Sequence, residues 1–354
     1  MTLFLASVKS ADEALLALAG GADIVDCKDP AQGALGALPP STVADIARAV
    51  NGRKPVSAVT GDLPMQPEVI ANAAQAMASA GAAYVKVGLF PGLGRAGCIR
   101  ALAPLAARRK IIGVLFADRD PDAALLPLMA ASGFAGAMLD TAGKGAGRLL
   151  SHCDMPALAA FVTACKAQGL LCGLAGSLEP PDVPRLLALA PDFLGFRGAL
   201  CNGGARGGAL DPASISVIRA LIPAKDRSPP AAAAAGGTDC IFVSDLTVPM
   251  RIGAYASEHL APQNVRFSVE ADVTRLGGQS DDMRAVFSYD LIIDAIRLMA
   301  ATRAFALVET VAEQLAANVL THPRVAQVRV KVEKLDLGLF RVGVSIERRR
   351  GAEV

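Results

Sequence analysis

Short apolar runs alternate with alanine- and leucine-rich segments of helical period along the first two-thirds of the chain. From Leu3 to about Ile222 there are eight runs and eight such segments. The runs are LFLASV, ADIVDCK, PVSAVTG, YVKVGL, IIGVLFA, GAMLDT, LLCGLAG and FLGFRGA. Near-continuous apolar runs of this length are typical of parallel strands buried on both faces. Eight strand–helix units within about 220 residues predict an α/β fold, a compact (β/α)8 TIM barrel, with a doubly wound open sheet as the alternative.

Capping residues mark three expected helix starts. Ser10, with Glu13 three residues later, forms a capping box ahead of the first helical segment. Asp120 and Asp211 each precede a proline, which pairs an N-cap residue with proline at the first helical position.

The pattern changes after residue 225, which predicts a second domain. Residues 226–239, DRSPPAAAAAGGTD, have no hydrophobic period and read as a linker. Beyond them, IFVSDLTVPMRIG, NVRFSVEADVTRL, VAQVRVKVEKL and FRVGVSIERR alternate with period two, as antiparallel strands with one covered face do. Helices are expected from about Tyr289 and about Ala306. We therefore expect a barrel domain over 1–225 and a small α+β domain over 240–354.

Composition narrows the function classes. The 354 residues are 53% hydrophobic, which suffices for two cores. The net charge is only +2, so we expect neither nucleic acid nor an anionic membrane as a partner. No run approaches the roughly 18 apolar residues of a membrane span, so a soluble cytoplasmic protein is expected. Seven scattered cysteines read as reduced thiols. The three histidines lack metal-ligand spacing, so no metal and no cofactor are expected, with a single Mg²⁺ held by carboxylates as the alternative.

Charged residues interrupt three of the predicted barrel strands where chemistry would lie. The second strand ends in Asp26-Cys27-Lys28, the fourth contains Lys86, and the sixth ends at Asp140, with Lys144 four residues on. In a barrel, catalytic groups lie where strands end and loops begin. A buried charge is costly unless it is paired, so these residues predict a mutually compensated cluster. The alternative is a structural ion-pair layer.

A partly desolvated lysine beside another cation has a lowered pKa and is a competent nucleophile toward a carbonyl. We therefore expect aldolase-type Schiff-base chemistry, with Lys28 forming the imine, Asp26 orienting it, and Lys86, Asp140 and Lys144 moving protons and stabilising charge. The same lysines could instead only neutralise phosphates or an enolate, with no covalent step.

The last two predicted strands end in glycine beside polar donors. Gly176 and Ser177 follow the seventh strand, and Arg197 and Gly198 follow the eighth. Exposed backbone N–H groups at this place in a barrel often hold a phosphate, so these four residues are the phosphate-binding candidates. Asp62, after the third strand, could join the charged cluster or serve only in a turn.

The segments GGADIVDCKDPAQGALGA, VSAVTGDLP, YVKVGLF, GAMLDTAGKG, GLAGSL and GFRGALCNGG resemble, in order and spacing, (5-formylfuran-3-yl)methyl phosphate synthase of methanofuran biosynthesis. The resemblance covers residues 1 to 222 and implies a carbon–oxygen lyase that condenses two triose phosphates, glyceraldehyde 3-phosphate, with loss of phosphate and water. It also implies that Lys28 forms the imine and that Lys86, Asp26, Asp140 and Lys144 are its partners. The loop after the fifth strand, ADRDPDAALLP, is shorter than in the family.

In the second domain, the residues alone suggest a glutamate, tyrosine and lysine set that could bind a pterin-like ring: Glu258, Tyr289, Glu309 and Lys334. The segments IGAYASEH, FSYDLIIDAI, FALVETVAEQLA, VRVKVEKL and VGVSIER resemble dihydroneopterin aldolase. The resemblance implies that Glu309 anchors the pterin, Tyr289 and Lys334 transfer protons and Glu258 assists. It also implies sites shared between subunits of a homo-oligomer. Leu335 follows Lys334 where the family usually has proline.

Two alternatives to a bifunctional lyase remain open on the sequence. The barrel could be a generic class I aldolase or a triose-phosphate isomerase-type enzyme that keeps the lysine cluster. The second domain could be a pterin-binding or oligomerising module without chemistry.

Overall fold

The computed structural model describes the chain except residues 144, 224–233, 256–257, 259, 277–285 and 352–354. The chain divides into two compact units, Met1–Pro229 and Pro230–Val354.

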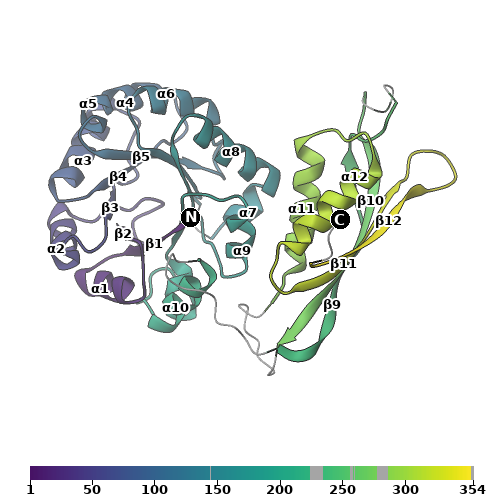
Figure 1. Cartoon of the computed structure of the whole chain (residues 1–354). Helices are drawn as coiled ribbons and strands as arrows, with labels where there is room; N and C mark the ends of the chain where they lie inside the picture. Colours follow the sequence, from purple (N-terminus) through teal and green to yellow (C-terminus); the bar gives the residue numbers. More distant parts are fainter. Residues whose placement is uncertain (144, 224–233, 256–257, 259, 277–285, 352–354) are drawn as a thin grey trace. The chain divides into compact units, whose positions relative to one another are not determined.

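The first unit is a closed barrel of eight parallel strands inside a ring of helices (Figure 1). The strands are β1 (Leu3–Val8), β2 (Ile24–Cys27), β3 (Val56–Val59), β4 (Tyr84–Gly88), β5 (Lys110–Phe116), β6 (Gly136–Asp140), β7 (Leu171–Leu174) and β8 (Phe193–Phe196). The helices are α1 (Ala11–Ala19), α2 (Pro40–Val50), α3 (Pro67–Ser79), α4 (Arg95–Ala101), α5 (Ala103–Ala106), α6 (Leu126–Ala131), α7 (Leu149–His152), α8 (Met155–Ala167), α9 (Asp182–Leu187) and α10 (Pro212–Leu221). Because β8 pairs with β1, the predicted (β/α)8 barrel is confirmed over the open sheet.

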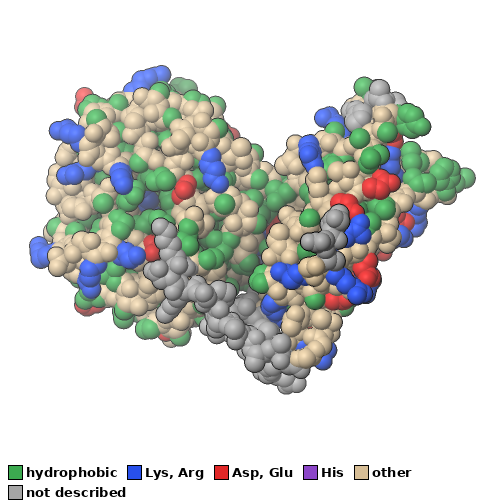
Figure 2. Space-filling model, viewed as in Figure 1, with side chains coloured by type: hydrophobic (Ala, Val, Ile, Leu, Met, Phe, Trp, Pro, Cys, Tyr) green, Lys and Arg blue, Asp and Glu red, His purple; other side chains and the backbone are tan. Residues whose placement is uncertain are grey.

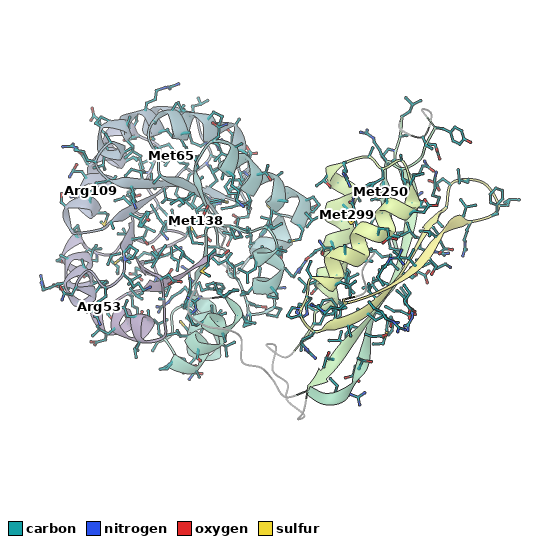
Figure 3. All side chains as sticks on the ribbon, in the orientation of Figure 1. Arg53, Met65, Arg109, Met138, Met250 and Met299 are labelled. Atoms are coloured by element: carbon teal, nitrogen blue, oxygen red, sulfur yellow. The ribbon has the colours of Figure 1, made fainter. Side chains whose placement is uncertain are left out.

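The continuous apolar runs reflect burial of both strand faces. All four residues of β2, β3 and β8 are buried, one face against the helices and the other inside the barrel. Met138 of β6 lies inside the barrel and is 2% exposed, whereas Arg53 and Arg109 lie at its periphery (Figure 3).

Two of the three predicted helix starts are confirmed. The Ser10 side chain accepts the Glu13 N–H at the start of α1, and the Asp211 side chain accepts the Ser214 N–H at the start of α10. The capping box expected at Ser10 is only half formed, because the Glu13 carboxylate accepts the Lys9 N–H in place of the Ser10 N–H. The prediction at Asp120 is wrong, because its φ of 54° is left-handed and unsuited to an N-cap. Asp122 caps a short 3-10 helix, η1 (Ala123–Leu125), instead.

The second unit is a four-stranded antiparallel sheet in the order β12-β11-β10-β9, with two helices packed on one face (Figure 1). Its elements are β9 (Ala234–Met250), β10 (Gln263–Leu276), α11 (Tyr289–Thr302), α12 (Val308–Leu320), β11 (Val325–Lys334) and β12 (Val342–Arg349). The inward-facing Val328, Val330 and Val332 of β11 share a core with Ala312 and Leu315 of α12. The predicted α+β fold is therefore present.

The sequence predicted a linker over residues 226–239, but in the structure the C-terminal part of this segment belongs to a strand. β9 begins at Ala234, and Thr238 and Asp239 pair with Thr274 and Val273 of β10. These residues lack hydrophobic alternation because this end of β9 is exposed. Residues 226–233 of the segment lie outside the described residues.

Over the described part of the chain, no helix combines the length and apolar character that crossing a membrane requires. Figure 2 shows basic and acidic side chains interspersed on the visible face, which agrees with the small net charge of +2.

Candidate active site

Four charged side chains meet inside the barrel at the carboxyl ends of β2, β4 and β6. Asp26 and Lys28 come from β2 and the residue just after it, Lys86 from β4, and Asp140 from the end of β6. They are 0, 8, 3 and 3% exposed, respectively. Since strand residues alternate in direction, Asp26 and Lys28 both point inward. The charged cluster expected from the sequence is therefore assembled.

Lys86 and Asp26 form the deeper of two ion pairs. Lys86 Nζ lies 2.7 Å from Asp26 Oδ2. The hydroxyls of Ser7 and Ser57 donate to the same carboxylate at 2.9 and 2.5 Å. Burial lowers the pKa of Lys86; the charge of Asp26 opposes this change, and the charge of Lys28 adds to it. Lys86 thus releases its proton more readily than an exposed lysine.

Lys28 and Asp140 form the second pair, nearer the mouth of the barrel. Lys28 Nζ lies 3.3 Å from Asp140 Oδ2, and the Thr141 N–H donates to Asp140 Oδ1 at 2.7 Å. Lys144 lies outside the described residues. In the segment just before Lys144, the backbone N–H groups of Ala142 and Gly143 donate to the Asp118 carboxylate at 2.7 and 2.6 Å.

Both pairs line a cavity of about 620 Å³ whose rim includes the predicted glycines. Gly176 has a φ of 120° and Ser177 a φ of 50°. A methyl group at Gly176 would come within 2.9 Å of the Thr141 side chain, so glycine is required there. Within the described residues, the N–H groups of Gly176, Ser177 and Gly198 donate to no protein acceptor. These N–H groups are therefore available to donate hydrogen bonds to a bound anion.

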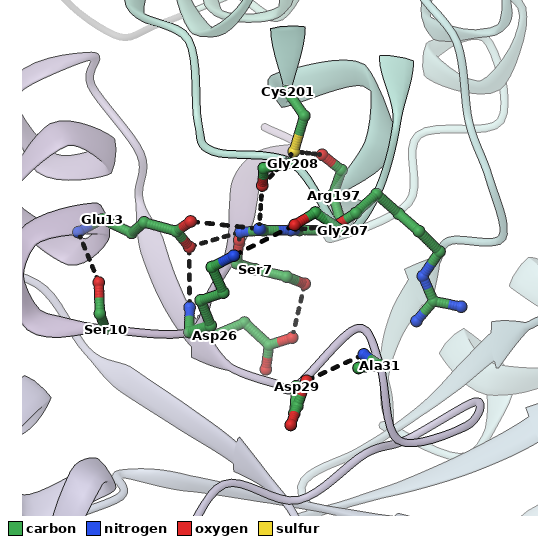
Figure 4. Close-up of polar contacts among 12 residues, drawn as sticks. Ser7, Ser10, Glu13, Asp26, Asp29, Ala31, Arg197, Cys201, Gly207 and Gly208 are labelled. Carbon is green, nitrogen blue, oxygen red and sulfur yellow. Dashed lines mark hydrogen bonds and ion pairs between the residues drawn. The ribbon is translucent and has the colours of Figure 1, made fainter. Parts of the chain in front are cut away.

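Arg197 has a different environment from the one expected. Its five N–H groups donate to the carbonyls of Ser7, Arg206 and Gly208 and to both carboxylate oxygens of Glu13 (Figure 4). Arg197 and Glu13 are both buried, with 8% of each side chain exposed. This geometry leaves the Arg197 side chain no donor for a phosphate and gives it a role in holding the loop that follows β8.

Sequence reasoning missed Arg206, which lines the same cavity from that loop. Its Nη2 lies 3.3 Å from the Gly33 carbonyl in the loop after β2. The available signal was a lone arginine among glycines after the last strand. Asp62 takes neither of its expected roles, because its carboxylate accepts the N–H groups of Ala34 and Leu35 and so anchors the loop after β2.

A larger cavity, about 840 Å³, opens at the amino ends of the strands. Its wall is mainly apolar, with Leu5, Ile112 and Phe193 among the lining residues, and it touches Lys86 and Ser57. The smaller cavity is the better candidate site, because it holds both ion pairs and lies at the catalytic end of such barrels.

The second unit brings together two of its four candidate residues. Lys334 Nζ donates to Glu258, and this hydrogen bond lowers the pKa of the glutamate. Tyr289 begins α11 and is 57% exposed, and Glu309 lies exposed in the first turn of α12.

Comparisons with known proteins agree with this two-part organisation. A family model described as 4-HFC-P synthase matches residues 4–219, and one described as Dihydroneopterin aldolase matches residues 241–347. A protein of Methylorubrum extorquens is 46% identical over 212 residues, which cover 60% of this chain and 88% of that protein. The (5-formylfuran-3-yl)methyl phosphate synthase of Methanosarcina mazei is 35% identical over 215 residues, which cover 57% of this chain and 92% of that protein.

A solved structure of E. coli dihydroneopterin aldolase in complex with neopterin is 30% identical, covers 31% of this chain and 98% of its own, and has a TM-score of 0.27. The closed barrel, its lysine cluster and the synthase relatives define an enzyme of the synthase and lyase class. The chain belongs to the 4-HFC-P synthase family, and its C-terminal domain resembles dihydroneopterin aldolase.

Proposed function

We propose that the barrel condenses two molecules of glyceraldehyde 3-phosphate into (5-formylfuran-3-yl)methyl phosphate through a Schiff base on Lys28, in methanofuran-type cofactor biosynthesis. The main support is the position of Lys28, whose Nζ lies 3.3 Å from Asp140 in a glycine-rimmed cavity. A second lysine with a lowered pKa, Lys86, lines the same cavity.

The proposed chemistry starts when the Lys28 amine attacks the carbonyl carbon of a bound triose phosphate. A C=N bond forms, and the carbonyl oxygen leaves as water. The imine then makes the C–H bonds next to it acidic, so a proton can be moved there by Lys86, Asp140 or Lys144. Over the whole reaction, two trioses yield one furan phosphate, one inorganic phosphate and two water molecules. Hydrolysis of the imine returns the Lys28 amine.

The test is incubation of the full chain with glyceraldehyde 3-phosphate, with and without borohydride, against Lys28→Ala. We expect the absorbance of a furan aldehyde, one phosphate released per product, and a reduced adduct on Lys28. All three should be lost in the variant. Lys166→Ala, at an exposed lysine of α8, is the matched control and should behave as the wild type.

Two other results would each replace the proposal. Triose interconversion without a furan product would support a generic class I aldolase or isomerase. If the protein neither reacts with the substrate nor forms a trapped adduct, the two lysine–carboxylate pairs would be interpreted as a structural ion-pair layer.

We further propose that the second unit binds a pterin in a homo-oligomer. The Glu258–Lys334 pair supports a binding point for a polar ring, and the exposed Tyr289 and Glu309 are available to a neighbouring copy. An exposed apolar tip on the β11–β12 hairpin also favours association: Leu337, Leu339, Phe340 and Val342.

Turnover of 7,8-dihydroneopterin, lost in Lys334→Ala and Glu309→Ala, would establish a second aldolase activity. Neopterin binding without turnover would favour a non-catalytic pterin-binding module. A monomer in solution would contradict the homo-oligomer.

A further inference from the structure

The cationic side chains that line the active-site cavity differ in one respect. Lys28, Lys86 and Arg197 each lie within 4 Å of a carboxylate. Arg206 makes no such ion pair with any described residue. Its contact with the Gly33 carbonyl, at 3.3 Å, is long for a hydrogen bond. Among the described residues, the cavity is therefore lined by three cations in direct ion pairs and by one guanidinium without a direct ion pair.

The backbone that carries Arg206 is held firmly although its sequence is rich in glycine. Arg197 Nε donates to the Arg206 carbonyl at 2.9 Å, and Arg197 Nη2 donates to the Gly208 carbonyl at 2.7 Å. Lys9 Nζ donates to the Gly207 carbonyl between them at 3.1 Å. Three successive carbonyls are thus bound by side chains from the ends of β8 and β1 (Figure 4).

Glu13 completes this support from α1. Its carboxylate pairs with Arg197 at 2.5 and 3.2 Å and accepts the Lys9 N–H at 2.9 Å. Since all five Arg197 donors are used, the pair is fully satisfied and its geometry is well defined. The loop after β8 is therefore tied to the start of α1, and these contacts hold the backbone of Arg206 beside the cavity.

The charge of Arg206 acts on the same space as the catalytic cluster. Burial lowers the pKa of Arg206. The charge of Asp140 opposes that change, as do the charges of Asp62 and Asp29, whereas the charge of Arg197 adds to it. A guanidinium remains protonated even so, and its planar N–H groups match the oxygens of a phosphate. Because the Arg206 side chain donates one long hydrogen bond and makes no direct ion pair with a described residue, most of its N–H groups are available to an anion in the cavity.

We propose that Arg206 binds a phosphate group of the substrate, with Glu13 and Arg197 as its positioning residues. This inference rests on the proposed function, in which two phosphorylated trioses enter one cavity. The rim N–H groups of Gly176, Ser177 and Gly198 would receive one phosphate, and Arg206 would receive the other. The side chain thus selects phosphorylated over unphosphorylated trioses.

The first test is calorimetric titration of the full chain with inorganic phosphate, which needs no turnover. Arg206→Ala should weaken one phosphate-binding event about 10- to 100-fold, the usual worth of charge-assisted hydrogen bonds. Arg206→Lys should bind with intermediate affinity, because it keeps the charge but loses the planar fork. Arg109→Ala, at the barrel periphery, is the matched control and should bind as the wild type (Figure 3).

The second test separates substrate binding from chemistry. In Arg206→Ala, KM for glyceraldehyde 3-phosphate should rise about 10- to 100-fold, while kcat and saturated borohydride trapping on Lys28 stay within about threefold. KM for unphosphorylated glyceraldehyde should not change. If phosphate affinity and KM match the wild type while the furan still forms, the role of Arg206 is refuted and the proposed function stands. If the wild type forms no furan but phosphate affinity still depends on Arg206, only the proposed reaction fails.

Discussion

At the scale of single residues, the chemistry of the barrel depends on how each buried charge is compensated. Lys86 is almost fully buried, and Asp26 is fully buried. The pair is stable because two serine hydroxyls complete the hydrogen bonds of Asp26. Removing either partner would therefore leave an uncompensated charge in a medium that solvates it poorly.

Lys86→Met should lower the free energy of unfolding by about 3–5 kcal/mol, because Asp26 stays buried without its cation. Lys86→Met combined with Asp26→Asn should recover part of this loss, since no ionised group remains unpaired. Neither variant should form the furan. Urea unfolding measures the effect, and Lys166→Met, at an exposed site, should change stability by less than about 0.5 kcal/mol. Equal losses in the single and double variants would contradict the charge argument.

The lowered pKa of Lys86 also predicts that the stability of the protein depends on pH. Its pKa in the folded protein is lowered by burial, so the unfolded chain holds more protons between that value and the ordinary lysine value of about 10.4. Stability of the wild type relative to Lys86→Met should therefore rise as pH increases through this window. Unfolding free energies of both proteins from about pH 8 to 10.5 provide the measurement. A difference that falls with pH would mean that the pKa of Lys86 is not lowered.

At the scale of elements, the loop after β8 depends on α1, at the other end of the barrel chain. Glu13 is a first-turn residue of α1, yet its carboxylate binds Arg197 of the β8 end. One side chain therefore links the first helix to the last barrel loop, beside the contact between β1 and β8 that closes the sheet.

Glu13→Gln should lower the free energy of unfolding by about 2–4 kcal/mol, because Arg197 is left buried without its counterion. It should also raise KM for the triose phosphate severalfold, since the loop that carries Arg206 loosens, while kcat stays within about twofold. Asp12→Asn, at the exposed neighbour in the same turn, is the control. A loss of stability with an unchanged KM would assign Glu13 a structural role alone.

The sequence predicts the elements better than their mutual contacts. The eight apolar runs correspond to the eight barrel strands, because a strand that is buried on both faces has a nearly continuous apolar sequence. The lysine cluster was predictable because charges inside such runs are rare. The partners of Arg197 could not be predicted from the sequence. Three of them are backbone carbonyls, which have no sequence signature, and Glu13 was interpreted as a capping residue.

At the scale of the whole molecule, each unit has its own hydrophobic core. The barrel closes through β1 and β8, which both lie within the first 222 residues. No strand of the second sheet pairs with a barrel strand among the described residues. The two folds therefore satisfy their backbone hydrogen bonds independently.

A chain of residues 1–222 should fold alone and keep the furan-forming activity within about twofold, because the barrel lacks none of its strands. It should also have a lower association state than the full chain, if the second unit drives assembly as proposed. Circular dichroism, the furan assay and light scattering after size exclusion give the three readouts. An insoluble or inactive barrel would show that the second unit supports it.

Because both units belong to one polypeptide, every barrel is synthesised together with one aldolase-like domain. Transcription, translation and degradation then act on both at once, so their copy numbers stay at one to one. Under the proposal that both units are catalytic, the ratio of their two fluxes is set by turnover numbers and substrate supply, and not by the expression of this gene.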